Sequence, residues 1–272
     1  MEYIDQSIKI ITQHDIMQHV ERCGRVCYKS EHKITDGSAL RFVRNIANLG
    51  HGSVMEHGSL YFKVNNTLNN DVEKQFLKIG KSKYSKMVYR DGYKYIYTNL
   101  RVVYEESPEI YKIVSEDLDL PNGVLYFEPE MSDPNRRVTV NIITDRRIET
   151  EIVRHRVASF SIESTRYVNY TKKGMIFIDM RKWLTNWRQK FWWKCSTIMT
   201  NFFYNRMIGS GCKPQIARSV LSSCNKAEIM MTAYVSDWEH FFELRTVKAA
   251  HPMIIEVAKD IKAIFKFNEI IK

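Results

Sequence analysis

The amino-acid sequence predicts an α+β fold, a small sheet flanked by separate helices. Two observations support this class. Segments with helical apolar spacing and short apolar or alternating segments both occur, but they lack the regular strand–helix alternation of a parallel sheet. The chain is also long enough for a sizeable core, with 272 residues of which 44% are hydrophobic. No repeat or low-complexity linker divides it, so we expect a single domain over residues 1–272.

The N-terminal elements are predicted from apolar spacing. Residues 13–28 have the periodicity of a helix, and residues 38–49 predict a second helix that Gly50 ends. Residues 59–64 alternate as a strand does.

The composition then changes over residues of about 65–137, which are rich in Lys, Asn and Tyr. Turn signals lie at 121–123 and 132–135, and residues 138–143 again predict a strand. We therefore expect an insertion at about 65–137 between two neighbouring strands of one sheet. The insertion could cover the functional site or extend an interface.

The rest of the chain is predicted in the following order. There is a helix over 145–155, a polar loop over 157–171, a strand over 175–180, a helix over 183–208, a helix over 214–221, a segment over 228–235 that fits strand or helix, a helix capped by Asp237 that runs to Ala250, and a last helix from Pro252. We interpret Trp183, Trp187, Phe191, Trp192 and Trp193 as core and subunit-contact residues.

The charge balance indicates an anionic partner. The net charge is +10, from 41 basic and 31 acidic residues. Such a field attracts nucleotides, phosphate-bearing cofactors, nucleic acid or a membrane surface, and a solvated lysine-rich surface explains part of it. Charge alone therefore leaves the class of ligand open.

Compartment and metal content are predicted from cysteines and apolar runs. The five cysteines are odd in number and scattered, which disfavours a disulfide framework. Cys23 and Cys27 would share a helix face, but no second pair completes a zinc site, so we expect no metal. Neither a signal peptide nor a membrane-spanning run is evident, so we expect a cytoplasmic protein.

The strongest signal for chemistry lies in residues 154–166, which contain three arginines, one histidine and one carboxylate. A guanidinium group pairs with two oxygens of a phosphate or carboxylate at once, and Ser and Glu suit a ribose or a base edge. A solvated basic helix end is the alternative interpretation. The interleaved serines and aromatic residues favour a lined pocket instead.

Arg154-His155-Arg156, seven further residues and Ser164-Thr165-Arg166 resemble the R-H-R-x7-S-x-R signature of the flavin-dependent thymidylate synthases. Residues 50–57 (GHGSVMEH), 213–221 (KPQIARSVL) and 238–245 (WEHFFELR) resemble three further segments of this family. The similarity covers about 20–64 and 138–260. It implies the family's α+β fold and a homotetramer with active sites at subunit interfaces.

The resemblance also implies an activity, the reductive methylation of dUMP to dTMP. The family uses FAD, NADPH and, as the one-carbon co-substrate, methylenetetrahydrofolate. The implied cofactor-binding residues are Ser53, Glu56, Arg154, His155, Arg156 and His240. The implied substrate-binding residues are Glu151, Arg154, Ile162, Glu163, Ser164, Thr165, Arg166, Arg218 and Arg245.

Arg245 is the implied catalytic residue, because the family places an arginine against the uracil ring. A fixed cation there favours loss of the N3 proton and raises electron density at C5, which can then attack an electrophile. The cysteines support this interpretation independently. The other class of thymidylate synthase uses a cysteine nucleophile in a Pro-Cys-His setting, and none of the five cysteines here has it.

Positions 234, 236 and 162 depart from the family pattern. Many members carry Asn and Arg against FAD where this chain has Tyr234 and Ser236, so another cation, supplied by the insertion, would have to replace that arginine. His240 stands where the family has Asn or His. Ile162 replaces the more usual Glu, although Glu163 is adjacent.

A basic nucleic-acid-binding protein is the alternative function, with the Lys/Tyr-rich insertion as the contact surface. It predicts salt-sensitive binding that ignores Arg245→Ala. The signature favours the enzyme, so we expect dUMP and folate as ligands, and neither nucleic acid nor a membrane as a partner.

Overall fold

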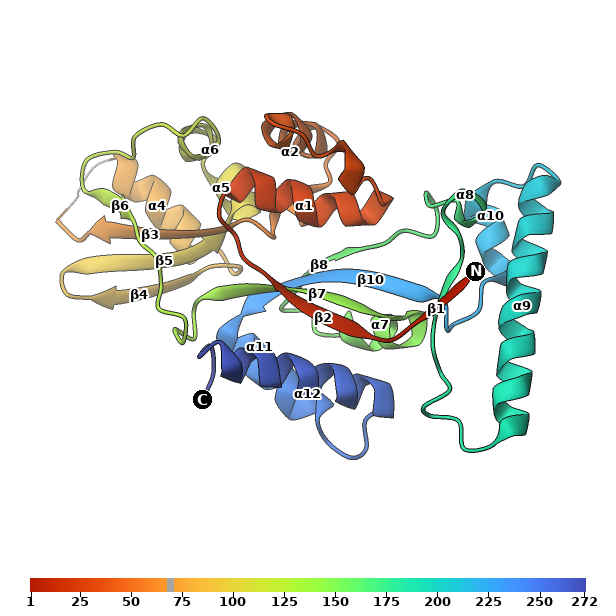
Figure 1. The fold of residues 1–272 in the computed structure, drawn as a ribbon. Helices are drawn as coiled ribbons and strands as arrows, with labels where there is room; N and C mark the ends of the chain where they lie inside the picture. The colour runs from red at the N-terminus through yellow and green to blue at the C-terminus, as the bar shows by residue number, and fades with distance from the viewer. Residues whose placement is uncertain (68–70) are drawn as a thin grey trace.

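A computed structural model describes residues 1–67 and 71–272 (Figure 1). Helices and sheets occur together without strand–helix alternation, which agrees with the predicted α+β class. The described residues form two four-stranded sheets and a two-stranded one.

The central sheet is antiparallel. Its strands lie in the order β2 (Ser7–Ile11), β7 (Arg137–Asp145), β10 (Lys226–Tyr234) and β8 (Ser159–Ile162). Val140 and Ile142 of β7 belong to the main core with Trp238 and Ile254 from the two helices α11 (Val235–Arg245) and α12 (Pro252–Phe267). These helices lie under the sheet in Figure 1, whereas α1 (Ile16–Tyr28) lies over its other face. Residues 228–235, which fitted strand or helix, thus form a strand up to Tyr234.

The N-terminal helices cover that second face. The predicted helices over 13–28 and 38–49 are confirmed as α1 (Ile16–Tyr28) and α2 (Ser38–Asn48). Asp15 caps α1 by accepting the Gln18 N–H at 2.7 Å. A 3₁₀ turn, η1 (Glu31–Lys33), joins them, and the short α3 (Gly52–Met55) follows α2.

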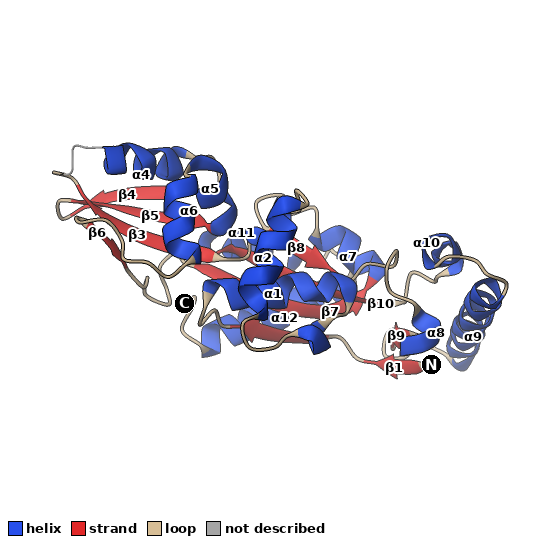
Figure 2. Ribbon diagram, turned by 90° about the horizontal axis from the view of Figure 1, so that it is seen from above, coloured by secondary structure: helices blue, strands red, loops and turns tan. Residues whose placement is uncertain are grey.

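The second four-stranded sheet lies at one end of the molecule (Figures 1 and 2). Its antiparallel strands lie in the order β4 (Lys86–Arg90), β5 (Tyr93–Asn99), β3 (Ser59–Asn65) and β6 (Val124–Tyr126). The helices packed against it are α4 (Asp71–Lys81), α5 (Leu100–Glu106) and α6 (Pro108–Ser115). Phe62, Phe76 and Ile96 are fully buried in a second core, to which α1 and α2 also contribute Val20 and Val43.

The strands predicted over 59–64 and 138–143 both form, as β3 and β7, but they are not neighbours in one sheet. β3 pairs with β5 and β6, whereas β7 pairs with β2 and β10. The expectation that these two strands flank an insertion within one sheet is therefore wrong. Strand β3 instead belongs to a separate sheet, whose other strands are formed by residues 86–126.

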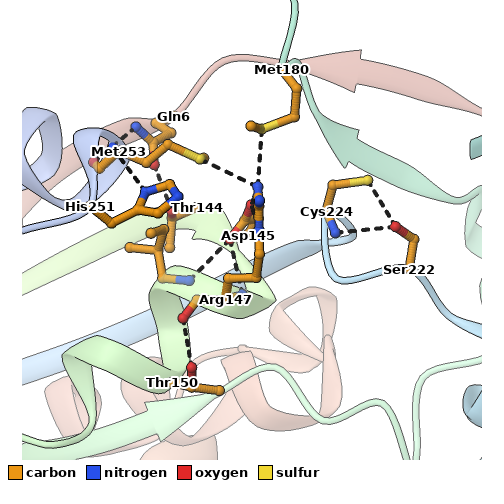
Figure 3. Close-up of polar contacts among 11 residues, drawn as sticks. Gln6, Thr144, Asp145, Arg147, Thr150, Met180, Ser222, Cys224, His251 and Met253 are labelled. Atoms are coloured by element: carbon orange, nitrogen blue, oxygen red, sulfur yellow. Dashed lines mark hydrogen bonds and ion pairs between the residues drawn. The ribbon is translucent and has the colours of Figure 1, made fainter. Parts of the chain in front are cut away.

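Helix α7 (Arg146–Ile152) follows β7 and is shorter than predicted. Figure 3 shows how it begins: buried Asp145 accepts the N–H groups of Arg147 and Ile148, each at 3.0 Å. The Arg147 guanidinium folds back onto the same carboxylate and reaches the sulfur atoms of Met180 and Met253. Because one carboxylate serves both as cap and as ion-pair partner, the direction of α7 is fixed.

Two predicted boundaries are wrong. The segment 157–171, predicted as a loop, contains β8 and the first residues of α8 (Tyr170–Lys173). Asp237 does not cap a helix, because α11 begins at Val235 and ends at Arg245. The remaining predicted elements are confirmed: the strand over 175–180 as β9 (Ile176–Ile178), which pairs with β1 (Glu2–Ile4), the helix from Pro214 as α10 (Pro214–Ala217) and η2 (Arg218–Val220), and the last helix as α12.

Helix α9 (Trp187–Gly209) stands at the end of the molecule opposite the second sheet (Figures 1 and 2). Trp187 is 71% exposed, Phe191 51% and Trp192 68%, so assigning these three to the core is wrong. Trp183 and Trp193 do pack against the main core. Among the described residues, no helix is both long and apolar enough to span a bilayer.

Candidate functional site

The segment Arg154-His155-Arg156 lies in a turn between α7 and β8. The His155 N–H donates to the Ile152 carbonyl and the His155 carbonyl accepts the Ala158 N–H, both at 3.1 Å. This turn buries His155 against the ring of Phe241, with ring centroids 4.7 Å apart, and leaves both arginines exposed. The guanidinium groups of Arg154 and Arg156 therefore lie at the surface, on either side of the buried His155.

Arg245, the last residue of α11, joins this turn. Its Nε donates to His155 Nε2 at 2.9 Å and its Nη2 to the Glu151 carbonyl at 2.9 Å. Its Nη1 lies 3.4 Å from a carboxylate oxygen of Glu151. Each of the three nitrogens of the Arg245 guanidinium therefore has a partner. The predicted site residues Arg245, His155 and Glu151 are in contact.

The protonation of His155 fits this contact. Burial, followed by the positive charge of Arg245 and that of His240, lowers the pKa of His155 to about 4. A neutral imidazole can accept at Nε2, whereas an imidazolium only donates. His155 therefore remains an acceptor for Arg245 throughout the physiological pH range.

A second group of predicted residues lies beyond the other end of β8. The Ser164 N–H donates to the Cys27 carbonyl at 3.0 Å, which ties the loop to the end of α1. The Arg166 N–H donates to Ser164 Oγ at 3.2 Å, and Arg218 Nη1 donates to Thr165 Oγ1 at 3.2 Å. The side chains of Arg166 and Arg218 are exposed. Two cations and two hydroxyl groups thus surround one exposed loop.

Glu163, in the same loop, faces inward. Its buried carboxylate lies 2.7 Å from Lys226 Nζ and accepts the Tyr170 hydroxyl at 3.2 Å. Its neighbour Ile162 is the last residue of β8, opposite Ile229 of β10. The side chain of Glu163 thus anchors the loop. Its backbone does so too, because its N–H donates to the Glu228 carbonyl at 2.9 Å and its carbonyl accepts from Arg146 at 3.0 Å.

A cavity of about 340 Å³ adjoins Arg156 and the start of β8. It is lined by Glu56, Lys83, Tyr84, Ser85, Lys86, Asn99, Arg137, Arg156, Val157, Ala158, Ser159, Tyr234 and Asp237. Two predicted cofactor residues, Glu56 and Arg156, therefore share one cavity. Glu56 pairs with Arg101 of α5 at 2.7 Å.

Sequence reasoning missed three cations of this cavity, Lys83, Lys86 and Arg137. In Arg137, Nη2 donates to Ser159 Oγ at 3.2 Å, while the buried Nε and Nη1 have no hydrogen-bond partner among the described residues. Such donors usually mark a missing ligand or water. Two signals were available in the sequence: the need for a cation to replace the arginine absent at Ser236, and the lysine-rich insertion.

The other predicted residues lie apart from these contacts. Ser53 is exposed at the start of α3, and exposed His240 has Nδ1 3.4 Å from a Glu243 oxygen. Arg218 and Arg245 do not line the cavity that holds Arg156. The described part of one chain therefore brings the predicted residues into three groups, around Arg245, around Ser164 and around Arg156.

Comparison with known proteins identifies the family to which these motifs belong. Residues 9–76 and 136–267 match the thymidylate synthase complementing protein family. The chain belongs to that family, which confirms the resemblance seen in the signature.

Individual relatives agree with this assignment. A flavin-dependent thymidylate synthase of Pyrococcus furiosus is 30% identical over 113 residues, which are 40% of this chain and 45% of the relative. Its namesake in Pyrococcus abyssi is 28% identical over 176 residues, 61% of this chain and 70% of the relative. A probable flavin-dependent thymidylate synthase of Paramecium bursaria Chlorella virus 1 is 23% identical over 146 residues, 47% of this chain and 65% of the relative. The chain thus spans less than half of the first of these relatives.

Proposed function

We propose that this protein is a flavin-dependent thymidylate synthase that converts dUMP to dTMP with FAD, NADPH and methylenetetrahydrofolate. Family membership and the names of the relatives support the proposal. The observation that carries it is the contact of Arg245 with His155 and Glu151, which unites the R-H-R signature with the W-x-x-F-x-x-L-R helix. We further propose the family's fold, one domain over residues 1–272 with an insertion at about 65–137, and a cytoplasmic location.

The residues around the cavity fit a flavin dinucleotide. FAD carries two phosphates, and Arg156 and Arg137 offer guanidinium groups whose fork matches phosphate oxygens. The unpartnered Nε and Nη1 of Arg137 are donors that such an anion would satisfy. Ser53, Glu56, Arg154, His155 and His240 complete the proposed cofactor set. The bound flavin supplies hydride transfer from NADPH to the one-carbon unit.

Arg245 acts on the uracil ring in this proposal. Its guanidinium is held by His155 and Glu151, so its position changes little when charge develops on the substrate. A fixed positive charge stabilises the ring after loss of the N3 proton, which enriches C5 in electrons without a cysteine adduct. Residue Glu151 would thereby orient Arg245 as well as line the substrate site.

The loop after β8 binds the dUMP phosphate in this proposal. Arg166 and Arg218 are exposed, and Ser164 and Thr165 supply hydroxyl donors between them. A dianionic phosphate would gain charge-assisted hydrogen bonds from both guanidinium groups. Arg154, Ile162 and Glu163 complete the proposed substrate set.

A homotetramer would bring the three groups of residues together. The arginines at positions 154, 156, 166 and 218 are all exposed in one chain. The exposed aromatic residues of α9 offer an apolar surface suited to a second copy of the chain. We therefore propose active sites built from more than one subunit.

The spectrum of the purified protein tests the proposed function. Protein incubated with FAD should show the absorption of oxidised flavin, which NADPH should bleach, and dUMP should accelerate the bleaching. Formation of dTMP from dUMP should require methylenetetrahydrofolate. A protein that neither binds FAD nor binds dUMP would contradict the proposal.

A further inference from the structure

Tyr234 docks the insertion onto the central sheet. Its hydroxyl, at the end of β10, shares its one proton between the carbonyls of Tyr84 at 3.2 Å and Tyr97 at 3.0 Å. The Tyr97 carbonyl belongs to β5 and the Tyr84 carbonyl to the turn before β4, so one buried side chain positions both segments. The turn that carries Lys83 and leads into Lys86 is thereby fixed against the start of α11.

Lys86 extends from this docked segment to Ser236. Its Nζ donates to Ser236 Oγ at 2.7 Å and lies 4.2 Å from the centre of the Tyr234 ring. Burial lowers the pKa of Lys86, while the charges of Asp237 and Asp133 oppose this shift. An ammonium has three donors, and the serine uses one. Within the described residues, no carboxylate lies within 4.0 Å of this Nζ.

Arg137 lies against the same ring. Its guanidinium carbon is 5.4 Å from the centre of the Tyr234 ring. Its buried Nε and Nη1 lack partners in the described part of the chain, and it forms no ion pair there. Leaving a buried charged donor unpaired costs free energy, so the arrangement fits an anion better than an empty site.

The remaining charged groups of the cavity make it positive. Lys83 and Arg156 add two cations to Lys86 and Arg137. Two carboxylates face them, Glu56 and Asp237, and Glu56 is already paired with Arg101. The excess of positive charge matches a ligand with two negative charges.

We infer that Lys86 and Arg137 bind the diphosphate of FAD, and that the insertion thereby forms one wall of the cofactor site. The inference rests on the proposed function, which supplies the dinucleotide. It also explains two departures from the family pattern together. Tyr234 holds the insertion in place, and Ser236 receives the lysine that replaces the missing arginine.

A purely mechanical role for Lys86 is the competing explanation, in which its bond to Ser236 only tethers the insertion. The two explanations differ in what charge does. A tether needs a donor of the right length, which Gln can supply, whereas an anion site needs a cation. Flavin titration of charge variants therefore separates them.

The test measures the Kd of the full-length protein for FAD by quenching of flavin fluorescence. Lys86→Gln and Arg137→Gln should each weaken FAD binding about 10- to 100-fold, the usual loss for a hydrogen bond to a charged group. Lys86→Arg should stay within about threefold of wild type, because it keeps the charge. Lys78→Gln removes an exposed lysine of α4 and should change nothing. Riboflavin, which lacks phosphate, should bind all these proteins equally.

A second, independent test places the positive charge on Ser236 instead of on Lys86. Ser236 lies next to the Lys86 ammonium, so Ser236→Arg in the Lys86→Gln background should restore most of the lost FAD affinity. The same change in the wild-type background should gain little, because two cations would then compete for one position. Thermal unfolding of each variant separates loss of binding from loss of folding, and Arg137→Gln carries the test if Lys86→Gln unfolds.

Each outcome decides the inference. Unchanged FAD affinity in both Gln variants would overturn it while leaving the proposed function intact, as would a loss confined to the KM for NADPH. If wild-type protein took up no FAD, the proposed function would fail instead. Thermal stabilisation of the protein by ADP would then test the diphosphate site separately. Loss of this stabilisation in Lys86→Gln would support the site, and unchanged stabilisation would contradict it.

Discussion

Arg245 Nε donates to His155 Nε2 at 2.9 Å, so the last residue of α11 is locked to the turn between α7 and β8. The two residues are ninety positions apart in sequence. Because burial and the Arg245 charge lower the pKa of His155 to about 4, the imidazole stays neutral and the contact persists at neutral pH. Their contact makes the orientation of Arg245 a property of the fold.

The first prediction concerns Arg245 itself. Arg245→Gln should reduce kcat for dTMP formation at least 100-fold, comparable to the loss of one oxyanion-hole donor. Uptake of FAD should change less than threefold, because Arg245 does not line the cavity next to Arg156. Turnover assays and flavin titration measure the two effects. Normal turnover in this variant would show that the residue has been assigned the wrong role.

Arg156 is expected to give the opposite result. It lines the cavity and its guanidinium is exposed, so Arg156→Ala should weaken FAD retention about 10- to 100-fold, as loss of a charge-assisted contact does. Gel filtration followed by flavin absorbance measures retention. With FAD in large excess, kcat should recover toward wild type. Arg188→Ala removes an exposed arginine of α9 outside the cavity and serves as the control.

The sequence predicts the type of most helices and strands, but it does not predict which strands pair with one another. Element types were mostly correct, because spacing of apolar residues marks α1, α2, β7 and α12 locally. Strand β8 was missed, since its serines alternate with only two apolar residues and resemble a loop. The partner of β3 was also predicted wrongly, because pairing is decided by distant segments.

The candidate site shows the same division. The signature and its flanking motifs indicated Arg245 and His155, but only the fold shows that they touch. Glu163 was expected to face the substrate, and no local pattern shows that its carboxylate pairs with Lys226 at 2.7 Å. Lys86 was missed because its role depends on how the insertion docks against Ser236.

The third prediction tests the proposal that the loop after β8 binds the dUMP phosphate. Arg218→Ala should raise the KM for dUMP about 10- to 100-fold and leave FAD affinity unchanged, because Arg218 contacts Thr165 and lies outside the cavity of Arg156. Deoxyuridine, which has no phosphate, should lose nothing further in this variant when its binding is measured by competition. An equal loss for dUMP and deoxyuridine would show that Arg218 acts on the fold rather than on the phosphate.

The fourth prediction concerns the exposed helix α9. Trp192→Glu places a charge where an apolar ring is 68% exposed, so it should weaken assembly without disturbing the fold of one chain. Light scattering after gel filtration should show a smaller particle and circular dichroism an unchanged helix content. Lys190→Glu, a neighbouring change at an exposed polar position of α9, is the matched control. An unchanged mass for Trp192→Glu would place the subunit interface elsewhere.

The last prediction follows from a buried chain of polar side chains beneath α1. His57 Nδ1 is 2.7 Å from Thr232 Oγ1, Thr232 is 2.7 Å from Thr139, and Thr139 is 3.0 Å from His19 Nε2. Burial, and next the charge of Arg22, lowers the pKa of His19 to about 4. Burial, and next the charge of His19, lowers the pKa of His57 well below its usual value. Both histidines are therefore neutral in the folded protein.

In the unfolded chain these histidines titrate near pH 6.5. As the pH falls below 6.5 the unfolded state binds protons that the folded state does not, so the free energy of unfolding should decrease, for His19 until about pH 4. The expected loss at pH 5 relative to pH 7.5 is about 2 kcal/mol for His19, and His57 should add a loss in the same direction. Urea denaturation at fixed protein concentration measures it. The decrease should be smaller in His19→Gln and unchanged in His32→Gln, which alters an exposed histidine, and equal decreases in all three proteins would refute the assignment.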